Sequence, residues 1–515
     1  MKRVKNRLTP IALGLFLSGF VSMPALAAVS DADQARIAQL EAQLATMQKE
    51  VKALKTSSKS TRVRHVAALE PVSTTSPPIS SATKTNKTLR QMIREEQEYL
   101  PFDLDVPGQA FVSTGPYVGV PLQFAGNNLI VNSPSVNTDV QLLSIRKKIS
   151  EQLHMMGGEI AKEPYHSHLL LSGVVEAQAN YINRGGAPST TDINVTNVSL
   201  DSIFLGPSSW TLGFVELSYD DTTPANSVFT STQNYRTANS RIFVNKAFIT
   251  IGDFSKSSLY GSAGQFYVPF GTYSSTMISN PLTKILTRTK ARSILFGFQQ
   301  QNKNAFYGSA YIFRGDSHAN SVPKVNNGGL NLGYKFDAGI VTGNFGGGVI
   351  ASIADSGGMQ LGNGFSTTEQ IVHRVPGYNA RGYFSFGQHY DIIVEYVGAS
   401  TQFNSNDMSF NHHGAKPSAF DIEGDYSFTI FGDKPSSIGL AYSKSNEALS
   451  LGIPLKRYAL TLNMSYWRNT LESLEFSCDR QYAANDVATG AGGSAASSEM
   501  GKVTKAVIAK IDYYF

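Results

Sequence analysis

The sequence predicts an all-β fold: a 16-stranded antiparallel transmembrane β-barrel, preceded by a short N-terminal coiled-coil helix. Three observations predict it. From His168 onward, apolar and polar residues alternate in sixteen runs. Short and long connections between these runs alternate along the chain. The chain then ends on an alternating stretch, residues 502–515, whose last residue is the aromatic Phe515. A barrel with lipid outside and water inside requires such alternation.

The N-terminus indicates export. Residues 1–27 are expected to be a signal peptide, with an apolar stretch at 11–21, a small-x-small cleavage site at 25–27, and cations before both at Lys2, Arg3, Lys5 and Arg7. A retained anchor is the alternative, but the apolar stretch is short for a membrane span. Export together with a barrel predicts location in the outer membrane of a bacterium, with the coiled coil in the periplasm.

Composition argues against nucleic acid as a partner and favours a β-rich fold. Removing the four signal cations from the 44 Lys and Arg leaves 40, against 39 Asp and Glu, so the mature chain is almost neutral and nucleic acid is not expected as a partner. A single cysteine, Cys478, cannot form an intramolecular disulfide. The 45 Gly, 29 Phe and 23 Tyr suit strands better than helices.

Residues 28–56 carry a heptad pattern. Apolar residues step by three and four along it, at Ile37, Leu40, Leu44, Met47, Val51 and Leu54. So narrow an apolar seam is buried by packing against the same seam in other copies of the chain, which predicts a homo-oligomer. We expect a trimer, because many outer-membrane porins are trimers. The alternative is a single amphipathic helix that lies on the base of the barrel.

Two segments separate the coiled coil from the barrel. Residues 57–109 have the Ser, Thr, Pro and Lys content of a flexible linker, with a short helix expected at 88–99. Residues 110–164 form a pre-barrel segment with a second helix expected at 139–156, ended by Gly157 and Gly158. This segment would either lie under the barrel or plug its lumen, and the sequence leaves both open.

The barrel is expected over residues 165–515. Its runs are 167–181, 194–205, 210–220, 239–252, 258–269, 292–301, 303–314, 328–337, 340–353, 374–386, 389–403, 416–431, 436–446, 454–468, 471–485 and 501–515. Tight connections follow the even-numbered runs, whereas most odd-numbered runs are followed by long polar loops. A soluble sandwich or solenoid gives no reason for this parity, but a membrane barrel has short periplasmic turns and long outer loops.

Carboxylates mark the inner face of the barrel. Asp421, Glu423 and Asp425 share one face of the run 416–431, and a row of three carboxylates requires water. Glu176, Glu216 and Glu395 are placed inward in the same way. In the last run, Ile511, Tyr513 and Phe515 are expected to meet lipid, and Lys510 and Asp512 to face the lumen.

Cations gather near the third outer loop. Lys284, Arg288, Lys290 and Arg292 lie at its end, in LTKILTRTKAR, and Arg314 follows in a stretch without acidic residues. If this loop folds inward, these side chains bind ligand or line the pore, and with the Asp421 carboxylates opposite they set a transverse field that favours anionic solutes. The alternative is that they pair with lipopolysaccharide phosphates or with lumen carboxylates and select nothing.

Catalysis has no recognisable motif. No G-x-S-x-G, H-E-x-x-H or Walker-type sequence occurs, so we expect no enzyme and no cofactor. The paired histidines His412 and His413, and His166 and His168, have no third ligand near in sequence and are read as solvated residues, so no metal site is expected.

Four stretches carry a family resemblance: KAFITIGDF at 246–254, GQFYVPFG at 264–271, TKARSILFGF at 289–298 and FRGDS at 313–317. With them the chain resembles the siderophore porins of the legiobactin-receptor (LbtU) family, and the second stretch is also similar to a strand of phosphate-selective-type porins. The resemblance implies uptake of a ferric siderophore across the outer membrane. The terminal Phe515 resembles the closing residue that the barrel assembly machinery reads as a sorting signal.

The sequence therefore predicts an outer-membrane porin for a small solute, with a ferric siderophore favoured by the resemblance. The alternatives are a general or anion-preferring diffusion porin, and a structural envelope anchor whose barrel only holds it in the membrane.

Overall fold

A computed structural model describes residues 102–106, 110–114, 137–155 and most of 167–515; within the last range 207, 221–240, 320–323, 364, 366–369, 388, 433, 468, 491–492 and 496–499 are outside the described part. The predicted signal peptide 1–27, the coiled coil 28–56 with its six seam residues and the helix at 88–99 also lie outside the described residues.

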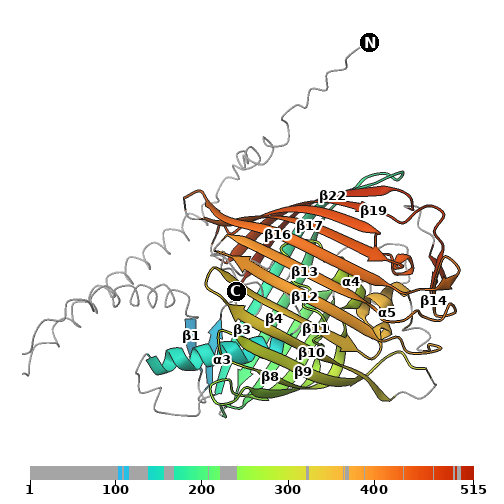
Figure 1. The fold of residues 1–515 in the computed structure, drawn as a ribbon. Helices are drawn as coiled ribbons and strands as arrows, with labels where there is room; N and C mark the ends of the chain where they lie inside the picture. The colour runs from blue at the N-terminus through green and yellow to red at the C-terminus, as the bar shows by residue number, and fades with distance from the viewer. Residues whose placement is uncertain are drawn as a thin grey trace, which may run out of the picture. The chain divides into compact units, whose positions relative to one another are not determined.

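Sixteen antiparallel strands close into a barrel in which each strand pairs with its neighbours along the chain and β22 pairs with β3 (Figure 1). They are β3 (Ser167–Arg184), β4 (Thr190–Leu205), β5 (Thr211–Asp220), β6 (Arg241–Gly252), β7 (Leu259–Tyr267), β8 (Lys290–Gln299), β9 (Ala305–Arg314), β10 (Val325–Asp337), β11 (Val341–Ile350), β12 (Gly377–Phe386), β13 (Tyr390–Ala399), β16 (Ser418–Ile430), β17 (Lys434–Asn446), β18 (Lys456–Met464), β19 (Thr470–Arg480) and β22 (Val503–Tyr514). Each predicted run overlaps one of these strands, with some ends displaced by up to five residues, so the predicted fold class is confirmed.

The outer face of the barrel is apolar. Large apolar side chains such as Ile249, Phe296 and Leu332 are exposed on it, which is the surface that lipid covers in an outer-membrane barrel. On β22, Ile511 and Tyr513 are 42% and 51% exposed, whereas Lys510 and Asp512 are 8% and 1% exposed. The predicted faces of the last strand are therefore confirmed.

No helix in the described part of the chain is long and apolar enough to cross a membrane.

The two rims of the barrel differ as predicted. Short turns such as 300–304 and 338–340 join strands at one rim, and long loops such as 268–289 and 400–417 leave the other. The long loops carry the smaller elements: α4 (Leu282–Thr287), η2 (Ile353–Asp355), α5 (Gly357–Asn363), β14 (Met408–Phe410), β15 (His413–Gly414), η3 (Leu449–Leu451), β20 (Ala488–Gly490) and β21 (Gly493–Ala495). A four-stranded sheet, β15-β14-β20-β21, joins two of these loops.

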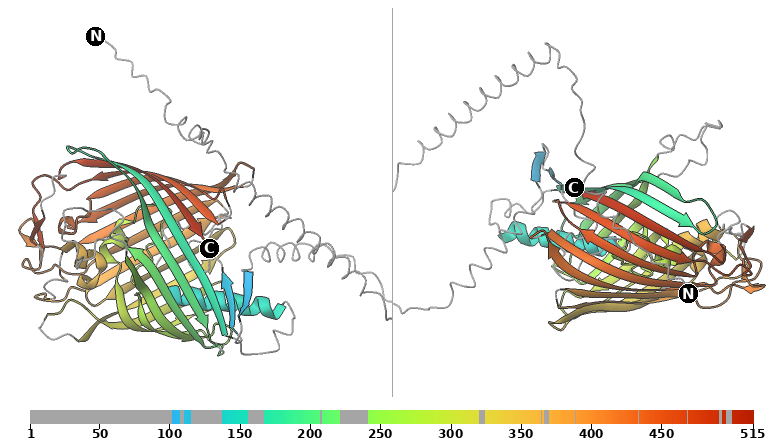
Figure 2. Two further views of the ribbon diagram at one scale, coloured as in Figure 1. Left: turned by 180° about the vertical axis from the view of Figure 1, so that it is seen from behind. Right: turned by 90° about the horizontal axis from the view of Figure 1, so that it is seen from above.

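The segment before the barrel also contains regular structure. Strands β1 (Phe102–Val106) and β2 (Ala110–Thr114) form a hairpin, and β2 pairs in parallel with the start of β3. Helix α3 (Thr138–Met155) lies at the end of the barrel that carries the C-terminus, as Figure 2 shows.

The C-terminal residue completes the closure of the barrel. The backbone N–H of Phe515 donates to the carbonyl oxygen of Gly173 at 3.1 Å, and the N–H of Gly173 donates to the carbonyl oxygen of Phe515 at 2.8 Å. A Cβ atom at position 173 would lie 2.4 Å from the ring of Phe515. A side chain at position 173 would therefore overlap both the ring of Phe515 and the carbonyl oxygen of Ser199.

We predict that Phe515→Ala and Gly173→Ala each reduce the amount of assembled barrel in the outer membrane. The first removes the ring that covers the seam, and the second creates an overlap of the kind that costs about 1–3 kcal/mol. Heat-modifiable migration of the barrel on gels of the membrane fraction measures the assembled form. Tyr513→Phe is the control, and normal levels of both test variants would contradict a role for this seam.

Candidate pore constriction

The third outer loop, residues 268–289 and called L3 below, folds into the barrel. Its first residues Val268, Phe270 and Tyr273 are fully buried, and so are Leu282 and Leu286 of α4. Helix α4 packs against β13 and β16 and against α5 (Figure 1). The apolar side chains of L3 thus belong to a core inside the lumen, and the loop narrows the barrel as the sequence suggested.

Carboxylates of the barrel wall hold L3 by its backbone. Glu395 on β13 accepts from the N–H of Thr272 at 2.8 Å through Oε1, and from the N–H of Tyr273 at 2.9 Å through Oε2. Glu423 on β16 accepts from the N–H of Thr276 at 2.9 Å. A buried N–H group that loses its acceptor costs about 1–3 kcal/mol, so these pairs fix the position of the loop.

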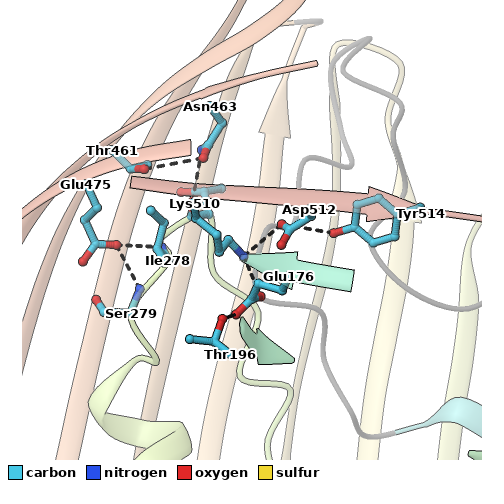
Figure 3. A network of polar contacts seen from close by, with 11 residues as sticks. Glu176, Thr196, Ile278, Ser279, Thr461, Asn463, Glu475, Lys510, Asp512 and Tyr514 are labelled. Carbon is cyan, nitrogen blue, oxygen red and sulfur yellow. Dashed lines mark hydrogen bonds and ion pairs between the residues drawn. The ribbon is translucent and has the colours of Figure 1, made fainter. Parts of the chain in front are cut away.

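A carboxylate on β19 also accepts hydrogen bonds from the backbone of L3. Oε2 of Glu475 accepts from the N–H groups of Ile278 and Ser279 at 2.6 and 2.9 Å (Figure 3). Asn463 on β18 donates to the carbonyl oxygen of Thr276 at 3.1 Å, and Arg457 donates to that of Asn280 at 3.0 Å. The sequence analysis did not single out Glu475, although its place between Ser473 and Ser477 on an alternating strand was a signal that it faces inward.

The expected hydration of the β16 carboxylates is wrong. Asp421, Glu423 and Asp425 face inward as predicted, but they are only 2%, 1% and 6% exposed. Hydroxyl groups of L3 meet two of them, from Ser275 to Glu423 at 2.5 Å and from Thr276 to Asp425 at 2.6 Å. Donors of the loop thus take the place that water was expected to fill.

A second group of charges lies on the strands from β22 to β6. Lys510 forms ion pairs with Glu176 at 3.1 Å and with Asp512 at 3.0 Å (Figure 3). Lys246 forms an ion pair with Glu216 at 2.7 Å. Glu176 and Glu216 therefore point into the lumen as predicted. Glu176 lies next to Lys510, which was also expected to face the lumen, and Glu216 lies next to Lys246, which was not among the predicted site residues.

Two of the predicted cations belong to L3 itself. Lys284 is buried in α4, and the guanidinium of Arg288 lies 4.6 Å from the centre of the Tyr267 ring. Burial holds the pKa of Lys284 well below the usual range of a lysine, and the nearby cations Arg288, Lys510 and Lys246 act in the same direction. The charges of Lys246 and Lys510, on the opposite wall of the barrel, therefore contribute to the lowered pKa of Lys284.

The other three predicted cations are strand residues and not loop residues. Lys290 and Arg292 lie on β8 and Arg314 ends β9, and all three are exposed. Arg292 has the same parity as the exposed Ile294 and Phe296, so it points outward and does not line the pore. The expected field between these cations and Asp421 is also absent, because L3 rests on the Asp421 strand instead of facing it.

Helix α3 enters the lumen from the rim of short turns. Its first turn reaches inward-facing residues: Ser262 on β7 donates to Asp139 at 2.8 Å, and Lys246 on β6 donates to Thr138 at 3.4 Å. Further along, Arg146 donates to the carbonyl oxygen of Thr211 at 3.0 Å, at the turn after β4. The start of α3 thus contacts inward-facing residues of the barrel, whereas β2, earlier in the same segment, pairs with β3.

The wall under α3 is apolar. Leu142 and Leu143 of the helix are buried in one cluster with inward-facing side chains of the barrel, namely Ile203, Leu212, Phe214, Phe248 and Leu295. A water-filled lumen would leave such residues wet, at a cost of about 25 cal/mol per Å² of apolar surface. The matching apolar faces indicate that α3 is a built-in part of the lumen.

Comparison with known proteins decides the family. The UPF0422 protein of Coxiella burnetii is 35% identical over 408 residues, which cover 78% of this chain and 84% of that protein. UPF0422 protein lpl2888 of Legionella pneumophila is 34% identical over 421 residues, covering 78% and 76%. This chain belongs to the UPF0422 family. No family model matches it.

Solved structures of outer-membrane barrels are similar to this UPF0422 protein at low identity. The anion-selective porin from Comamonas acidovorans is 10% identical with a TM-score of 0.44, covering 68% of this chain and 100% of that one. The outer membrane channel DcaP of Acinetobacter baumannii is 14% identical with a TM-score of 0.43, covering 68% and 97%.

We predict that Glu395→Gln loosens L3, whereas Glu475→Gln does not. Both oxygens of Glu395 accept backbone N–H groups, so an amide NH₂ in place of one oxygen would face a donor. Glu475 uses one oxygen for both N–H groups, and within the described residues its other oxygen has no partner. Losing a hydrogen bond to a charged group costs about 1.5–3 kcal/mol.

Hydrogen exchange at Thr272 and Tyr273 measures this loosening, and noise in the single-channel current is a second readout. Equal protection of these amides in both variants would show that the wall carboxylates do not hold the loop.

We predict that Leu142→Asp together with Leu143→Asp expels α3 from the lumen. Two buried leucines contribute about 1.5–3 kcal/mol each, and carboxylates cannot replace them in an apolar cluster. Protease cleavage within α3 and a larger conductance should both follow. Replacing the same two residues by methionine keeps the volume and should keep the helix docked; an unchanged conductance in the aspartate variant would contradict the plug.

Proposed function

We propose that this UPF0422 protein is a channel of the outer membrane that passes a small anionic solute, and that this solute is a ferric siderophore. The observation that supports a selective channel is the placement of L3. One wall holds the loop by its backbone, so that Lys284 and Arg288 lie in the lumen towards Lys246 and Lys510 of the other wall.

The balance of charge in the constriction supports an anionic solute. The carboxylates Glu395, Glu423 and Glu475 already accept N–H groups of L3 and are buried under it. The loop contributes the cations Lys284 and Arg288 to the same region, and a cluster of cations in a narrow passage raises the local concentration of anions. Ferric chelates whose ligands are carboxylates are anions of this kind.

The identity of the solute rests on the resemblance to the LbtU family and not on the geometry. The trimer and the barrel assembly machinery as partners rest on the sequence in the same way. A channel needs no catalytic residues, so the proposal includes no enzymatic step.

A closed envelope anchor is the second candidate. The position of α3 favours it, because a helix packed on an apolar inner wall fills part of the lumen. In that case the barrel would hold the N-terminal segment in the membrane and pass no solute.

Conductance of the purified protein in planar bilayers tests the proposal. We expect an anion preference in the reversal potential, and block of the current by a ferric polycarboxylate siderophore. Lys284→Met with Arg288→Gln should shift the reversal potential towards cations, while Lys303→Gln, at an exposed turn, should not.

The anion preference should also depend on pH. The depressed pKa of Lys284 means that its charge is present at low pH and is lost as the pH rises, at a lower pH than for an exposed lysine. Lys284→Met should remove this dependence. If no chelate alters the current and the loop variants leave selectivity unchanged, the proposal is wrong; a barrel that does not conduct would favour the anchor.

A further inference from the structure

Two arginines lie side by side on the lipid-facing surface. In the ladder of β8 and β9, Ser293 pairs with Phe313 on the inner face and Ile294 with Ile312 on the outer face. The next outward positions towards the outer rim are Arg292 on β8 and Arg314 on β9, and both side chains are exposed. Continuing this register by one residue places Arg292 and Arg314 on neighbouring positions on the outside of the barrel.

Their height in the membrane follows from the strands. β8 begins at Lys290, directly after L3, and β9 ends at Arg314, before the next outer loop. Below the arginines the outer face is apolar, with Ile294 49%, Ile312 55% and Phe296 69% exposed. The arginines thus stand at the outer edge of the apolar belt, where the headgroups of the outer leaflet begin.

This arrangement needs an anion. Like charges directly opposite on neighbouring strands repel each other. In the described part of the chain, no carboxylate lies within ion-pair distance of Arg292 or Arg314. Lys290 adds a third cation at the same edge, with its Nζ 3.1 Å from Oδ1 of Asn245. Among the described residues, these cations have no carboxylate partner, and phosphate headgroups of the membrane can supply the counter-charge.

A surface pocket of about 490 Å³ adjoins Arg292, lined also by Val244, Ala247, Gly264 and Gln265. It opens where the pairing of β6 with β7 ends, at Ala247 and Gln265. The amide of Gln265 donates to the carbonyl oxygens of Val244 and Asn245 at 3.1 Å each, and Nε of Arg292 lies 3.5 Å from its oxygen. Gln265 is thus fixed between the strands and directs Arg292 across the mouth of the pocket.

We propose that Arg292, Arg314 and Lys290 bind a phosphate group of an outer-leaflet glycolipid, the lipopolysaccharide of the outer membrane. The planar guanidinium groups offer paired donors to phosphate oxygens. The acyl chains of the same molecule lie against Ile294, Ile312 and Phe296 below. The site is on the outside of the barrel, so the proposal does not depend on what passes through the lumen.

Binding of bis-phosphorylated lipid A to the full-length barrel in detergent, followed by native mass spectrometry, tests the site. We expect the double variant Arg292→Gln, Arg314→Gln to bind about tenfold more weakly, because each cation at a membrane surface contributes to the attraction of anionic lipid. Lipid A without phosphates should bind both proteins equally and weakly. Lys303→Gln, an exposed cation at the rim of short turns, is the matched control and should bind like the unchanged protein.

Two results would overturn the proposal. One is equal binding of phosphorylated lipid A by the double variant and the unchanged protein, with both migrating as folded barrels on gels. The other is displacement of the lipid by inorganic phosphate at equal concentration, which would identify the site as one for free phosphate. Retention of the lipid in the presence of phosphate supports binding of the whole glycolipid.

Discussion

The backbone N–H groups of L3 are the constraint on which the lumen depends. A loop folded into a barrel loses its water, and each of its buried N–H groups requires an acceptor. The wall supplies carboxyl oxygens as acceptors at Glu395, Glu423 and Glu475, each of which faces L3 donors at 2.6–2.9 Å. Because the loop is held through its backbone, its side chains remain available for packing inside the barrel, as Leu282 and Leu286 show.

The two halves of the wall serve different segments. The strands from β13 to β19 hold L3, which enters from the outer rim, while the apolar inner faces of β4 to β8 hold α3, which enters from the opposite rim. The two segments approach each other, since Asn137 and Asp139 line the same small void as Tyr267 and Pro269 at the base of L3. Movement of α3 would therefore open space directly beneath the constriction.

The barrel could be predicted from local sequence patterns, because the alternation of a strand and the length of a turn are both visible within a short stretch of sequence. The contacts that shape the lumen were not predictable in this way. Glu475 meets Ile278 from 197 positions away, and no pattern near either residue indicates the other. For the same reason the acidic face of β16 suggested water, when its actual partner is a loop 147 residues earlier in the chain.

The point at which β8 begins decides where the neighbouring basic side chains lie. Thr289 is buried, and its carbonyl oxygen accepts from the N–H of Val268 at 3.0 Å, which closes L3 and starts β8 at Lys290. On one side of this point Arg288 follows the loop into the barrel, and on the other side Arg292 follows the pleat to the lipid face. Since side chains alternate along a strand, a shift of the register of β8 by one residue would turn Arg292 inward. One run of basic residues in the sequence thus becomes two surfaces, one towards the solute path and one towards the membrane.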